Sequence, residues 1–251
     1  MKTGIIIQAR MGSTRMPGKV LTPFYGASSI LDLVIQTAKK NKFSFPVIVA
    51  TSLSKEDDAI ENLATKNGLA VFRGDEKNVL KRFVDAAHKF TFDHVVRVCA
   101  DNPLLDLGLF NELLVVAEKD DSDYVSYKVD EHTPAIRSHW GIFAEVVKTD
   151  ALDRALVETN DPIYLEHVTN YIYMHPEKFS LNWVKAPEEI YGINDIRFTV
   201  DTSEDFRMMQ EFYALLAERA NPVNFKGALS LLELHPEFKK IMQERISANA
   251  K

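Results

Sequence analysis

The stretch that decides the fold is GIIIQARMGSTRMPGKVL, residues 4–21. Its first part, 4–9, is mostly apolar and rich in isoleucine, which predicts a buried strand. The next ten residues combine three cations with two glycines and one proline: Arg10, Gly12, Arg15, Pro17, Gly18 and Lys19. Cations this close repel one another unless an anion lies between them, and glycines let backbone amides approach that anion. The sequence therefore predicts a strand followed by a loop that binds the triphosphate of a nucleotide.

The spacing of this loop separates it from two common phosphate-binding motifs. A Walker A loop needs GxxxxGK followed by Ser or Thr, and a dinucleotide-binding turn needs GxGxxG. Residues 4–21 contain neither pattern. We therefore disfavour a P-loop hydrolase and a dinucleotide-dependent dehydrogenase. The remaining alternative to a triphosphate site is a basic turn in solvent.

Length and charge limit the class of protein. The chain has 251 residues, 46% of them hydrophobic, and a formal net charge of −6. This length fits one domain, 1–251, and the negative charge argues against nucleic acid as a partner. Because there is no run of about 18 apolar residues and no cleavable leader, we expect a cytoplasmic protein without membrane insertion. The single cysteine, Cys99, lies in an apolar run and is expected to be a buried structural thiol rather than a nucleophile.

Short β-branched runs alternate with amphipathic stretches along the first half of the chain. This alternation predicts an α/β fold with a mostly parallel central sheet and helices on both faces. Ser29 with Asp32 resembles a capping box, and Asn67 before Gly68 predicts a helix end. Ligands of such sheets bind beyond the carboxyl ends of the strands, where we expect one cleft. The expected strands are 4–9, 47–51, 70–74, 94–100 and 123–128, and the expected helices are 29–41, 55–67, 76–90 and 107–119.

The pattern loosens after Glu131. Residues 132–146 predict a long loop or an irregular extension of the sheet. We expect the whole segment 131–175 to form a substrate lid or a dimer arm. The other expected elements are helices at 149–158, 162–174 and 203–219, a strand at 197–202, and a helical tail at 221–251.

Two aspartates directly follow predicted strands and can meet at the carboxyl edge of the sheet. Asp101 follows HVVRVCA, and Asp201 follows RFTV. Such carboxylates suit Mg²⁺, which prefers a few carboxylates together with substrate phosphates. Each aspartate also precedes a predicted helix, so a helix N-cap is the alternative. Asp205 either reaches the same metal or stabilises the first turn of its helix.

Three charged residues near the strand ends have open assignments. Arg97 lies within an otherwise apolar strand and needs an anion, either Asp101 or a phosphate. Arg82, on the helix after the strand 70–74, is either a surface ion-pair partner or a ligand. Asp75 is either a helix cap or a contact of the nucleoside.

These segments together resemble a known family. QARMGSTRMPGKVL is similar to the signature loop of the cytidylyltransferases that activate sugar acids, the group of CMP-sialic acid and CMP-Kdo synthetases, and most closely to the spore coat polysaccharide biosynthesis protein F type. The similarity extends in family order to VFRGDEKNVLKRF, VVRVCADNPLLD, LEHVTNYIY and FTVDTSEDF, and covers 1–206. It implies a Rossmann-like nucleotidyltransferase fold of the glycosyltransferase-A-like kind. It also implies CTP and an acidic sugar as partners, Mg²⁺ as cofactor, and a homodimer.

The resemblance assigns roles to particular residues. It implies that Arg15, Lys19 and Asp101 are catalytic and that Asp101 and Asp201 hold Mg²⁺. The anomeric hydroxyl of the sugar acid would attack the α-phosphorus of CTP and release pyrophosphate. The implied nucleotide-binding residues are Ala9, Arg10, Met11, Gly12, Ser13, Arg15, Lys19, Arg73, Asp75 and Asp101, with Arg73 and Asp75 near the base and ribose.

The acceptor side follows from the carboxylate of a 2-keto sugar acid. This group needs a cation or several donors, and the candidates are Arg137, His139 and His167. Glu145 belongs to GIFAE, which loosely resembles an acidic family segment and makes Glu145 a further substrate candidate. The flanking SHW departs from the family pattern and leaves the sugar open. His167 matches a family motif, or it packs against Tyr171 at helical spacing.

Three other activities are compatible with the sequence. A nucleotidyltransferase could use another NTP and a sugar 1-phosphate, because the loop predicts a triphosphate better than a base. A non-catalytic homologue would bind nucleotide without turnover. A glycosyltransferase would need a DxD metal motif, and the letters DSD in residues 120–124 fit a solvated loop better.

Overall fold

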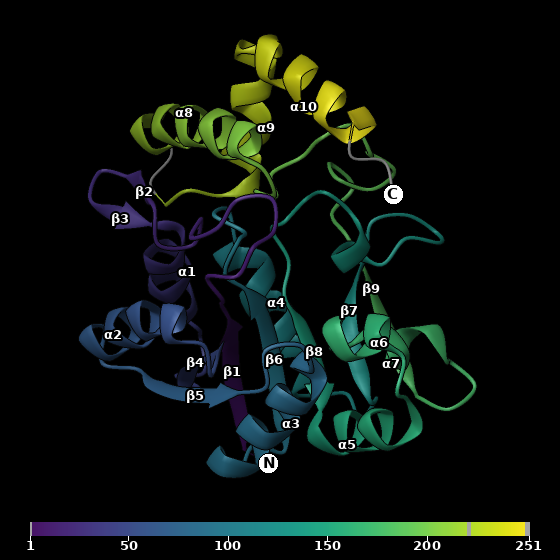
Figure 1. Ribbon diagram of the computed structural model, residues 1–251. Helices are drawn as coiled ribbons and strands as arrows, with labels where there is room; N and C mark the ends of the chain where they lie inside the picture. Colours follow the sequence, from purple (N-terminus) through teal and green to yellow (C-terminus); the bar gives the residue numbers. More distant parts are fainter. Residues whose placement is uncertain (1, 220–221, 249–251) are drawn as a thin grey trace.

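The structure is a computed structural model that describes residues 2–219 and 222–248, and a seven-stranded sheet forms its centre. Its strands are β1 Thr3–Gln8, β4 Val47–Ser52, β5 Ala70–Gly74, β6 His94–Cys99, β7 Tyr124–Lys128, β8 Glu145–Lys148 and β9 Leu181–Lys185. They lie in the order β5-β4-β1-β6-β8-β7-β9 (Figure 1). The four strands of the first half pair in parallel, and only β8 is antiparallel to its neighbours among the described strands of this sheet. The predicted, mostly parallel α/β sheet is confirmed.

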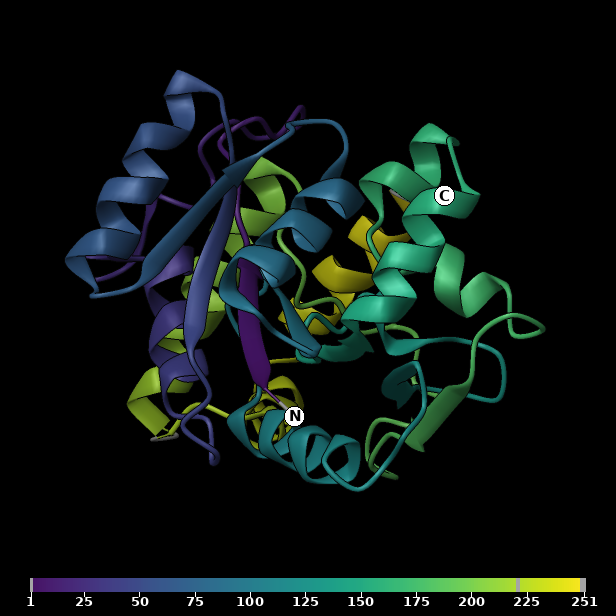
Figure 2. The same ribbon diagram turned by 90° about the horizontal axis from the view of Figure 1, so that it is seen from below.

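Helices cover both faces of this sheet, and the side chains of β1 alternate accordingly. Ile5 and Ile7 face one core, and Ile6 faces the other. Figure 2 shows the sheet from below, between the two helical layers. The first layer contains α1 Ile30–Lys39, α2 Asp58–Lys66 and α4 Leu107–Ala117, and the second contains α3 Val79–Phe90, α5 Thr149–Glu158 and α7 Asn170–Met174.

Local chemistry sets several boundaries in the first half. Ser29 caps α1 through reciprocal hydrogen bonds with Asp32, which confirms the predicted capping box. α2 ends at Lys66 with Asn67 as its C-cap, and Gly68 follows with a φ of +74°, a conformation that favours glycine. α3 begins later than predicted, because the Asn78 side chain accepts the backbone N–H of Lys81 and caps the helix there.

The second half departs from the prediction in its details. The predicted strand 197–202 is wrong: these residues form no strand and make single backbone bonds instead of a ladder, from Phe198 N–H to His139 O and from Val200 N–H to Asp101 O. The predicted helix 162–174 breaks at His167 into α6 Pro162–Glu166 and α7. The prediction missed β8 inside the expected loop, the edge strand β9, and the hairpin of β2 Pro23–Tyr25 with β3 Ser28–Ser29.

Three helices lie over the carboxyl ends of the strands (Figure 1): α8 Ser203–Arg219, α9 Phe225–Leu234 and α10 Pro236–Ala248. They confirm a helical tail over 225–248, while residues 221 and 249–251 lie outside the described part. Within 131–175, β8 is part of the central sheet and α5 packs on it, so a lid or arm is now expected only of the remaining residues. No helix in the described ranges is both long and apolar enough to cross a membrane.

Candidate active site

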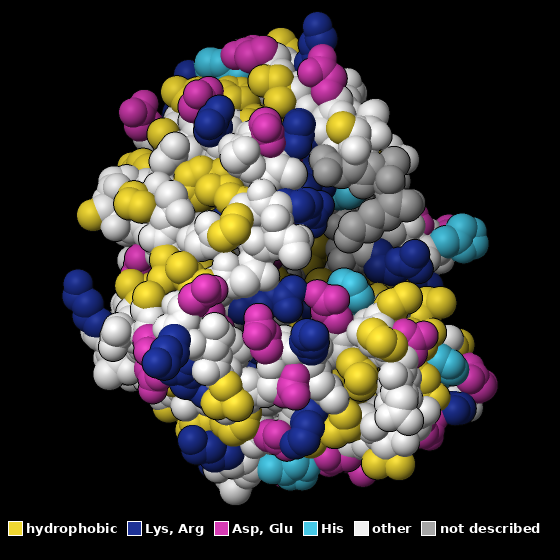
Figure 3. Space-filling view, viewed as in Figure 1, with side chains coloured by type: hydrophobic (Ala, Val, Ile, Leu, Met, Phe, Trp, Pro, Cys, Tyr) yellow, Lys and Arg dark blue, Asp and Glu magenta, His cyan; other side chains and the backbone are white. Residues whose placement is uncertain are grey.

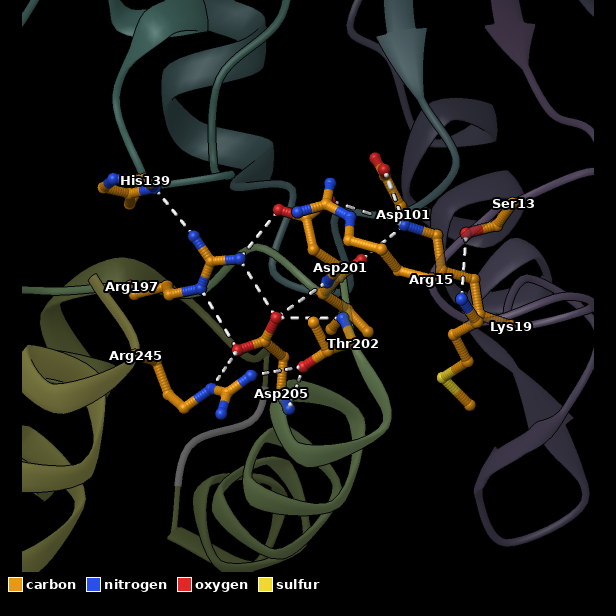
Figure 4. Close-up of polar contacts among 12 residues, drawn as sticks. Ser13, Arg15, Lys19, Asp101, His139, Arg197, Asp201, Thr202, Asp205 and Arg245 are labelled. Atoms are coloured by element: carbon orange, nitrogen blue, oxygen red, sulfur yellow. Dashed lines mark hydrogen bonds and ion pairs between the residues drawn. The ribbon is translucent and has the colours of Figure 1, made fainter. Parts of the chain in front are cut away.

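The loop after β1 meets two aspartates at the carboxyl edge of the sheet (Figure 4). Lys19 Nζ lies 3.0 Å from Asp101 Oδ2 and 3.9 Å from Asp201 Oδ1. Arg15 Nη2 lies 2.8 Å from the same Asp201 oxygen. The structure therefore brings together the two loop cations and the two strand-end carboxylates that the sequence singled out. Figure 3 shows a hollow in the middle of this face, bordered by Lys and Arg side chains.

The loop is held in place by a buried carboxylate that the sequence reasoning missed. Asp57 accepts the backbone N–H of Met11 at 2.7 Å and also hydrogen bonds from Thr51 and Ser52. Burial alone would raise the pKa of Asp57, but the bonds from Ser52, Met11 and Thr51 lower it below its usual value. Gly18, with a φ of +73°, turns the loop back toward the sheet. The only sequence signal for Asp57 was its place early in a helix after β4.

Arg10 forms its ion pair with Glu166 and not with Asp101 or Asp201. Its Nη2 lies 2.8 Å from Glu166 Oε1, so it links the loop to α6. Both side chains are partly exposed, with 32% of Arg10 and 49% of Glu166 accessible. A nucleotide can therefore compete for Arg10 with an ion pair that solvent already weakens.

The predicted base-side residues have structural partners. The Arg73 guanidinium donates to the Ser52 and Ser54 carbonyls and to the carboxylates of Asp58 and Glu61, so it anchors the turn that follows β4. Asp75 accepts the backbone N–H groups of Lys77 and Asn78. Those backbone bonds, led by the one from Asn78, lower the pKa of Asp75.

Arg82 is not a surface ion-pair partner, which corrects one of the two predictions for it. Its side chain is fully buried, and Nη1 donates to the Asp75 carbonyl at 3.0 Å. Nε and Nη2 have no hydrogen-bond partner among the described residues. Burial first, and then the nearby charge of Arg10, lowers the pKa of Arg82 to about 10. A buried guanidinium with two unpaired nitrogens, near enough to Arg10 for that charge to lower its pKa, favours the alternative that Arg82 serves a ligand.

The actual helix caps decide between the two predictions for Asp101 and Asp201. α4 is capped by Asp106, whose Oδ1 accepts the Leu109 N–H. α8 begins with a reciprocal pair in which Thr202 Oγ1 accepts from Asp205 N–H and Asp205 Oδ2 accepts from Thr202 N–H. Neither cleft aspartate caps a helix, so both carboxylates remain available to a ligand or metal.

Asp201 is oriented by a buried arginine. Arg197 Nη2 donates to Asp201 Oδ2 at 2.7 Å and to Asp205 Oδ2 at 3.0 Å, and its Nη1 contacts His139 Nδ1 at 2.7 Å (Figure 4). Burial alone would raise the pKa of Asp201, but Arg197, Lys19 and Arg15 lower it. Asp205 is fully buried, and its carboxylate accepts hydrogen bonds from the Arg197 side chain and the Asp201 N–H. The alternative that it reaches the metal is therefore wrong.

Glu145 lies in the core and not in the cleft, which corrects its prediction as a substrate contact. Its side chain is 3% exposed and accepts hydrogen bonds from Arg97, Tyr124 and Thr169. Glu145 is thus the anion that Arg97 requires, in place of Asp101 or a phosphate. Burial raises the pKa of the nearby Cys99 thiol to about 11, in line with a structural rather than a nucleophilic cysteine.

The other acceptor candidates lie in separate places. Arg137 is exposed in the short helix Ala135–Arg137, whereas His139 contacts the buried Arg197. His167 ends α6, so the helical spacing to Tyr171 does not hold, and Tyr171 stacks on His175 with ring centroids 4.0 Å apart. The letters DSD lie at the opposite edge of the sheet, where Asp121 pairs with Lys148 at the end of β8.

The carboxylates of Asp101 and Asp201 suit a divalent cation whose remaining ligands come from the substrate. No group of three or more His, Cys, Asp or Glu side chains in the described ranges could hold a metal ion by itself. Mg²⁺ is commonly held by one or two carboxylates plus phosphate oxygens, with no need for a protein cage. Lys19 Nζ lies within 4 Å of both aspartates, so a bound metal ion would share these carboxylates with the Lys19 ammonium.

The fold and this edge of the sheet define a nucleotidyltransferase. The family described as "Cytidylyltransferase" matches residues 4–249, and the chain belongs to that family of enzymes. It is 34% identical to the spore coat polysaccharide biosynthesis protein SpsF of Bacillus subtilis, over 92% of this chain and 94% of that protein. It is 36% identical to an uncharacterized protein of Methanocaldococcus jannaschii, over 96% of this chain and 94% of the relative.

Solved structures agree on the fold. A cytidylyltransferase from Leptospira borgpetersenii superposes with a TM-score of 0.83 at 29% identity, over 95% of this chain and 96% of that one. A CMP-2-keto-3-deoxy-manno-octonic acid synthetase complexed with CTP superposes with a TM-score of 0.62 at 16% identity, over 86% of this chain and 99% of that one. The predicted Rossmann-like nucleotidyltransferase fold is confirmed.

Proposed function

We propose that this enzyme transfers CMP from CTP to the anomeric hydroxyl of a 3-deoxy-2-ketosugar acid and releases pyrophosphate, in the cytoplasm and as part of polysaccharide or surface glycan biosynthesis. The observation that carries the proposal is the meeting of Arg15 and Lys19 with Asp101 and Asp201 at the carboxyl edge of the sheet. Membership of the cytidylyltransferase family supports the transfer of CMP, and the name of SpsF, a spore coat polysaccharide biosynthesis protein, supports the role in polysaccharide biosynthesis.

The loop is suited to hold the phosphates that leave as pyrophosphate. Arg15 is 42% exposed at the cleft, and backbone bonds from Ser13 N–H and Gly18 N–H to Met11 O close the loop. Charge grows on the phosphoryl oxygens during transfer, and fixed cations stabilise it without reorganising. Lys19, which is buried apart from its contact with the cleft carboxylates, adds a cation at a fixed place.

A divalent cation fits the same reaction. Bound at Asp101 and Asp201, Mg²⁺ would neutralise charge on the α-phosphoryl oxygens. Arg197 holds Asp201 Oδ2 at 2.7 Å, so Asp201 Oδ1 points toward Arg15, Lys19 and the cleft. The protein thereby presents one oxygen of Asp201 in a set direction.

Among the predicted acceptor residues, Arg137 is the one that we expect to bind the sugar carboxylate. It is exposed in the short helix Ala135–Arg137, within the segment 131–175 that is expected to cover the substrate. A guanidinium binds a carboxylate through two parallel hydrogen bonds. The proposal therefore assigns the sugar carboxylate to Arg137 and leaves the remaining substituents of the sugar to α6 and α7.

A homodimer is the second part of the proposal. Val157, Ile163 and Met174 expose 84%, 60% and 48% of their surfaces on α5, α6 and α7. α5 packs on α7, and α5 and α6 both pack on α3, so these exposed apolar side chains lie on neighbouring helices and are candidates for a contact surface. Sedimentation of the wild type and of Ile163→Lys tests this: a dimer that the substitution weakens is expected, and a monomeric wild type contradicts it.

The decisive assay measures pyrophosphate release with CTP, ATP, GTP and UTP against a panel of 3-deoxy-2-ketosugar acids. Release is expected with CTP and one member of the panel, and it should stop on chelation of divalent cations and resume with added Mg²⁺. Release with another NTP and a sugar 1-phosphate would contradict the proposed substrates. Nucleotide binding without release in any mixture would identify a non-catalytic homologue.

A further inference from the structure

The C-terminal helix α10 reaches the polar cluster that orients Asp201. Arg245 Nε lies 3.3 Å from Asp205 Oδ1, and its Nη2 donates to Thr202 Oγ1 at 2.8 Å (Figure 4). Arg245 also lies 3.5 Å from Glu204. These contacts join the last described helix to the start of α8, directly after the cleft aspartate.

Asp205 is the centre of this cluster. Its two oxygens accept hydrogen bonds from the Arg197 side chain, from the backbone N–H groups of Asp201 and Thr202, and from Arg245. It is fully buried, so water cannot replace a lost donor there. The backbone bond from Asp201 ties the position of that residue to Asp205.

Charge balance makes Arg245 more than a packing residue. The Arg197 guanidinium is shared between two carboxylates, Asp201 at 2.7 Å and Asp205 at 3.0 Å. Asp201 has a second cation, Arg15, at its Oδ1, whereas the fully buried Asp205 shares Arg197 with Asp201 and needs a further positive charge of its own. Arg245 supplies the second positive charge, at the Asp205 oxygen that faces away from Asp201. Without it, Asp205 would draw Arg197 more strongly and loosen its hold on Asp201.

We propose that Arg245 is a positioning residue for the metal-binding carboxylate Asp201, acting through Asp205 and Arg197. The inference rests on the proposed function, because it takes Asp201 to hold the divalent cation. Groups that orient metal ligands typically change metal affinity or activity about 10- to 100-fold when they are removed. α10 is therefore part of the catalytic unit and more than a cover for the strand ends.

The same helix offers a matched control. Lys239 pairs with Asp195 at 3.0 Å, and this ion pair fastens α10 to the chain just before Arg197. Lys239 has 42% of its side chain exposed and makes no recorded contact with the Asp205 cluster in the described ranges. Loss of Lys239 tests whether any weakened attachment of α10 disturbs the site.

The test compares Arg245→Gln, Arg245→Lys and Lys239→Gln with the wild type. Binding of Mn²⁺ is followed by electron paramagnetic resonance in the presence of a non-hydrolysable CTP analogue, and turnover is followed by pyrophosphate release. For Arg245→Gln we expect an Mn²⁺ dissociation constant about tenfold higher and a kcat about tenfold lower, with the KM for CTP changed less than about threefold. Arg245→Lys should recover part of the loss, and Lys239→Gln should match the wild type.

Two results would overturn the inference: wild-type Mn²⁺ affinity in Arg245→Gln, or an equal loss of affinity in Lys239→Gln. Thermal unfolding of each variant shows whether it is folded, and a Gln variant that does not fold leaves Arg245→Lys to be compared with the same control. A wild type that neither binds Mn²⁺ with the analogue nor releases pyrophosphate would instead refute the proposed function itself.

Discussion

The carboxylates at the cleft and the carboxylate in the core meet their cations in opposite ways. Asp101 and Asp201 are 36% and 26% exposed, and their partners Arg15 and Lys19 come from a loop. Glu145 is 3% exposed, and its partner Arg97 lies on the neighbouring strand of the same sheet. A pair held by two strands belongs to the fold, because neither member can leave. A pair held by a loop at the edge can exchange one partner for a ligand.

The largest effect is expected where the core pair is broken. Glu145→Leu removes the anion that neutralises Arg97 and leaves a buried unpaired charge, which costs about 3–5 kcal/mol of unfolding free energy. Denaturant titration measures this loss directly. The double variant Glu145→Leu with Arg97→Met should recover much of it, since an apolar pair can replace a buried ion pair. Wild-type stability in Glu145→Leu would show that the ion pair of Glu145 with Arg97 does not stabilise the fold.

The next effect is expected at the cleft, in activity and not in stability. Asp101→Asn and Lys19→Ala should each lower turnover about 100-fold or more, a loss of about 2.7 kcal/mol in the transition state. The melting temperature of Asp101→Asn should stay close to that of the wild type, because the carboxylate is 36% exposed. The matched control is Asp121→Asn, at the opposite edge of the sheet, which should keep full turnover. Wild-type rates in a folded Asp101→Asn protein would refute the metal assignment.

The cleft could be predicted from the sequence because its signals are local. Arg15 and Lys19 lie in one short loop, and Asp101 follows a strand whose parallel pairing brings its end beside that loop. The topology rule for parallel sheets then places these residues together without knowledge of any long-range contact. Asp201 was found in the same way, although residues 197–202 form no strand of the sheet.

The core cluster could not be predicted because it depends on distant pairings. Glu145 meets Arg97 only because β8 inserts antiparallel between β6 and β7, and nothing in GIFAE signals that insertion. Arg245 meets Asp205 across 40 residues of sequence, through the packing of α10 on α8. Asp57 had no signal beyond its place after β4, so its hold on the loop backbone emerged only from the structure.

Arg82 is buried like the core residue Arg97 but is not fully paired. It is as buried as Arg97, yet two of its guanidinium nitrogens lack a partner in the described ranges. Replacing an uncompensated buried cation by Met should leave the unfolding free energy unchanged or raise it by about 1 kcal/mol. Because a bound triphosphate would offset the repulsion between Arg10 and Arg82, Arg82→Met should raise the CTP dissociation constant about tenfold. Calorimetry and thermal unfolding measure both quantities.

Arg97→Met is the matched comparison for Arg82→Met. It removes a satisfied cation and should lower stability, with CTP affinity maintained in the protein that remains folded. A strong loss of stability in Arg82→Met, together with unchanged CTP binding, would place Arg82 with the core and contradict its assignment to the ligand.

The smallest effect on stability is expected from a buried histidine, His94, at the amino end of β6, away from the cleft. His94 is 8% exposed, and both of its ring nitrogens lack a hydrogen-bond partner among the described residues. Burial first, and then the charge of Lys148, lowers the pKa of His94 below its usual 6.5, although Asp93, Glu118 and Asp121 act in the opposite direction. The unfolded chain therefore binds the proton more readily than the folded one. The stability that neutral His94 allows is fully present above pH 6.5 and is lost as the pH falls toward the lowered pKa.

The comparison of wild type with His94→Leu at about pH 7.5 and about pH 5.5 measures this effect, since one proton contributes at most about 1.4 kcal/mol per pH unit. The decrease in unfolding free energy between the two pH values should be smaller in the variant. His132→Asn, in the exposed loop after β7, is a control away from this site and should keep the wild-type decrease. An unchanged decrease in His94→Leu would mean that the acidic neighbours, and not burial, decide the charge of His94. The surroundings of His94 would then resemble the cleft, where exchangeable partners determine the charge of a side chain. They would differ from the core around Glu145.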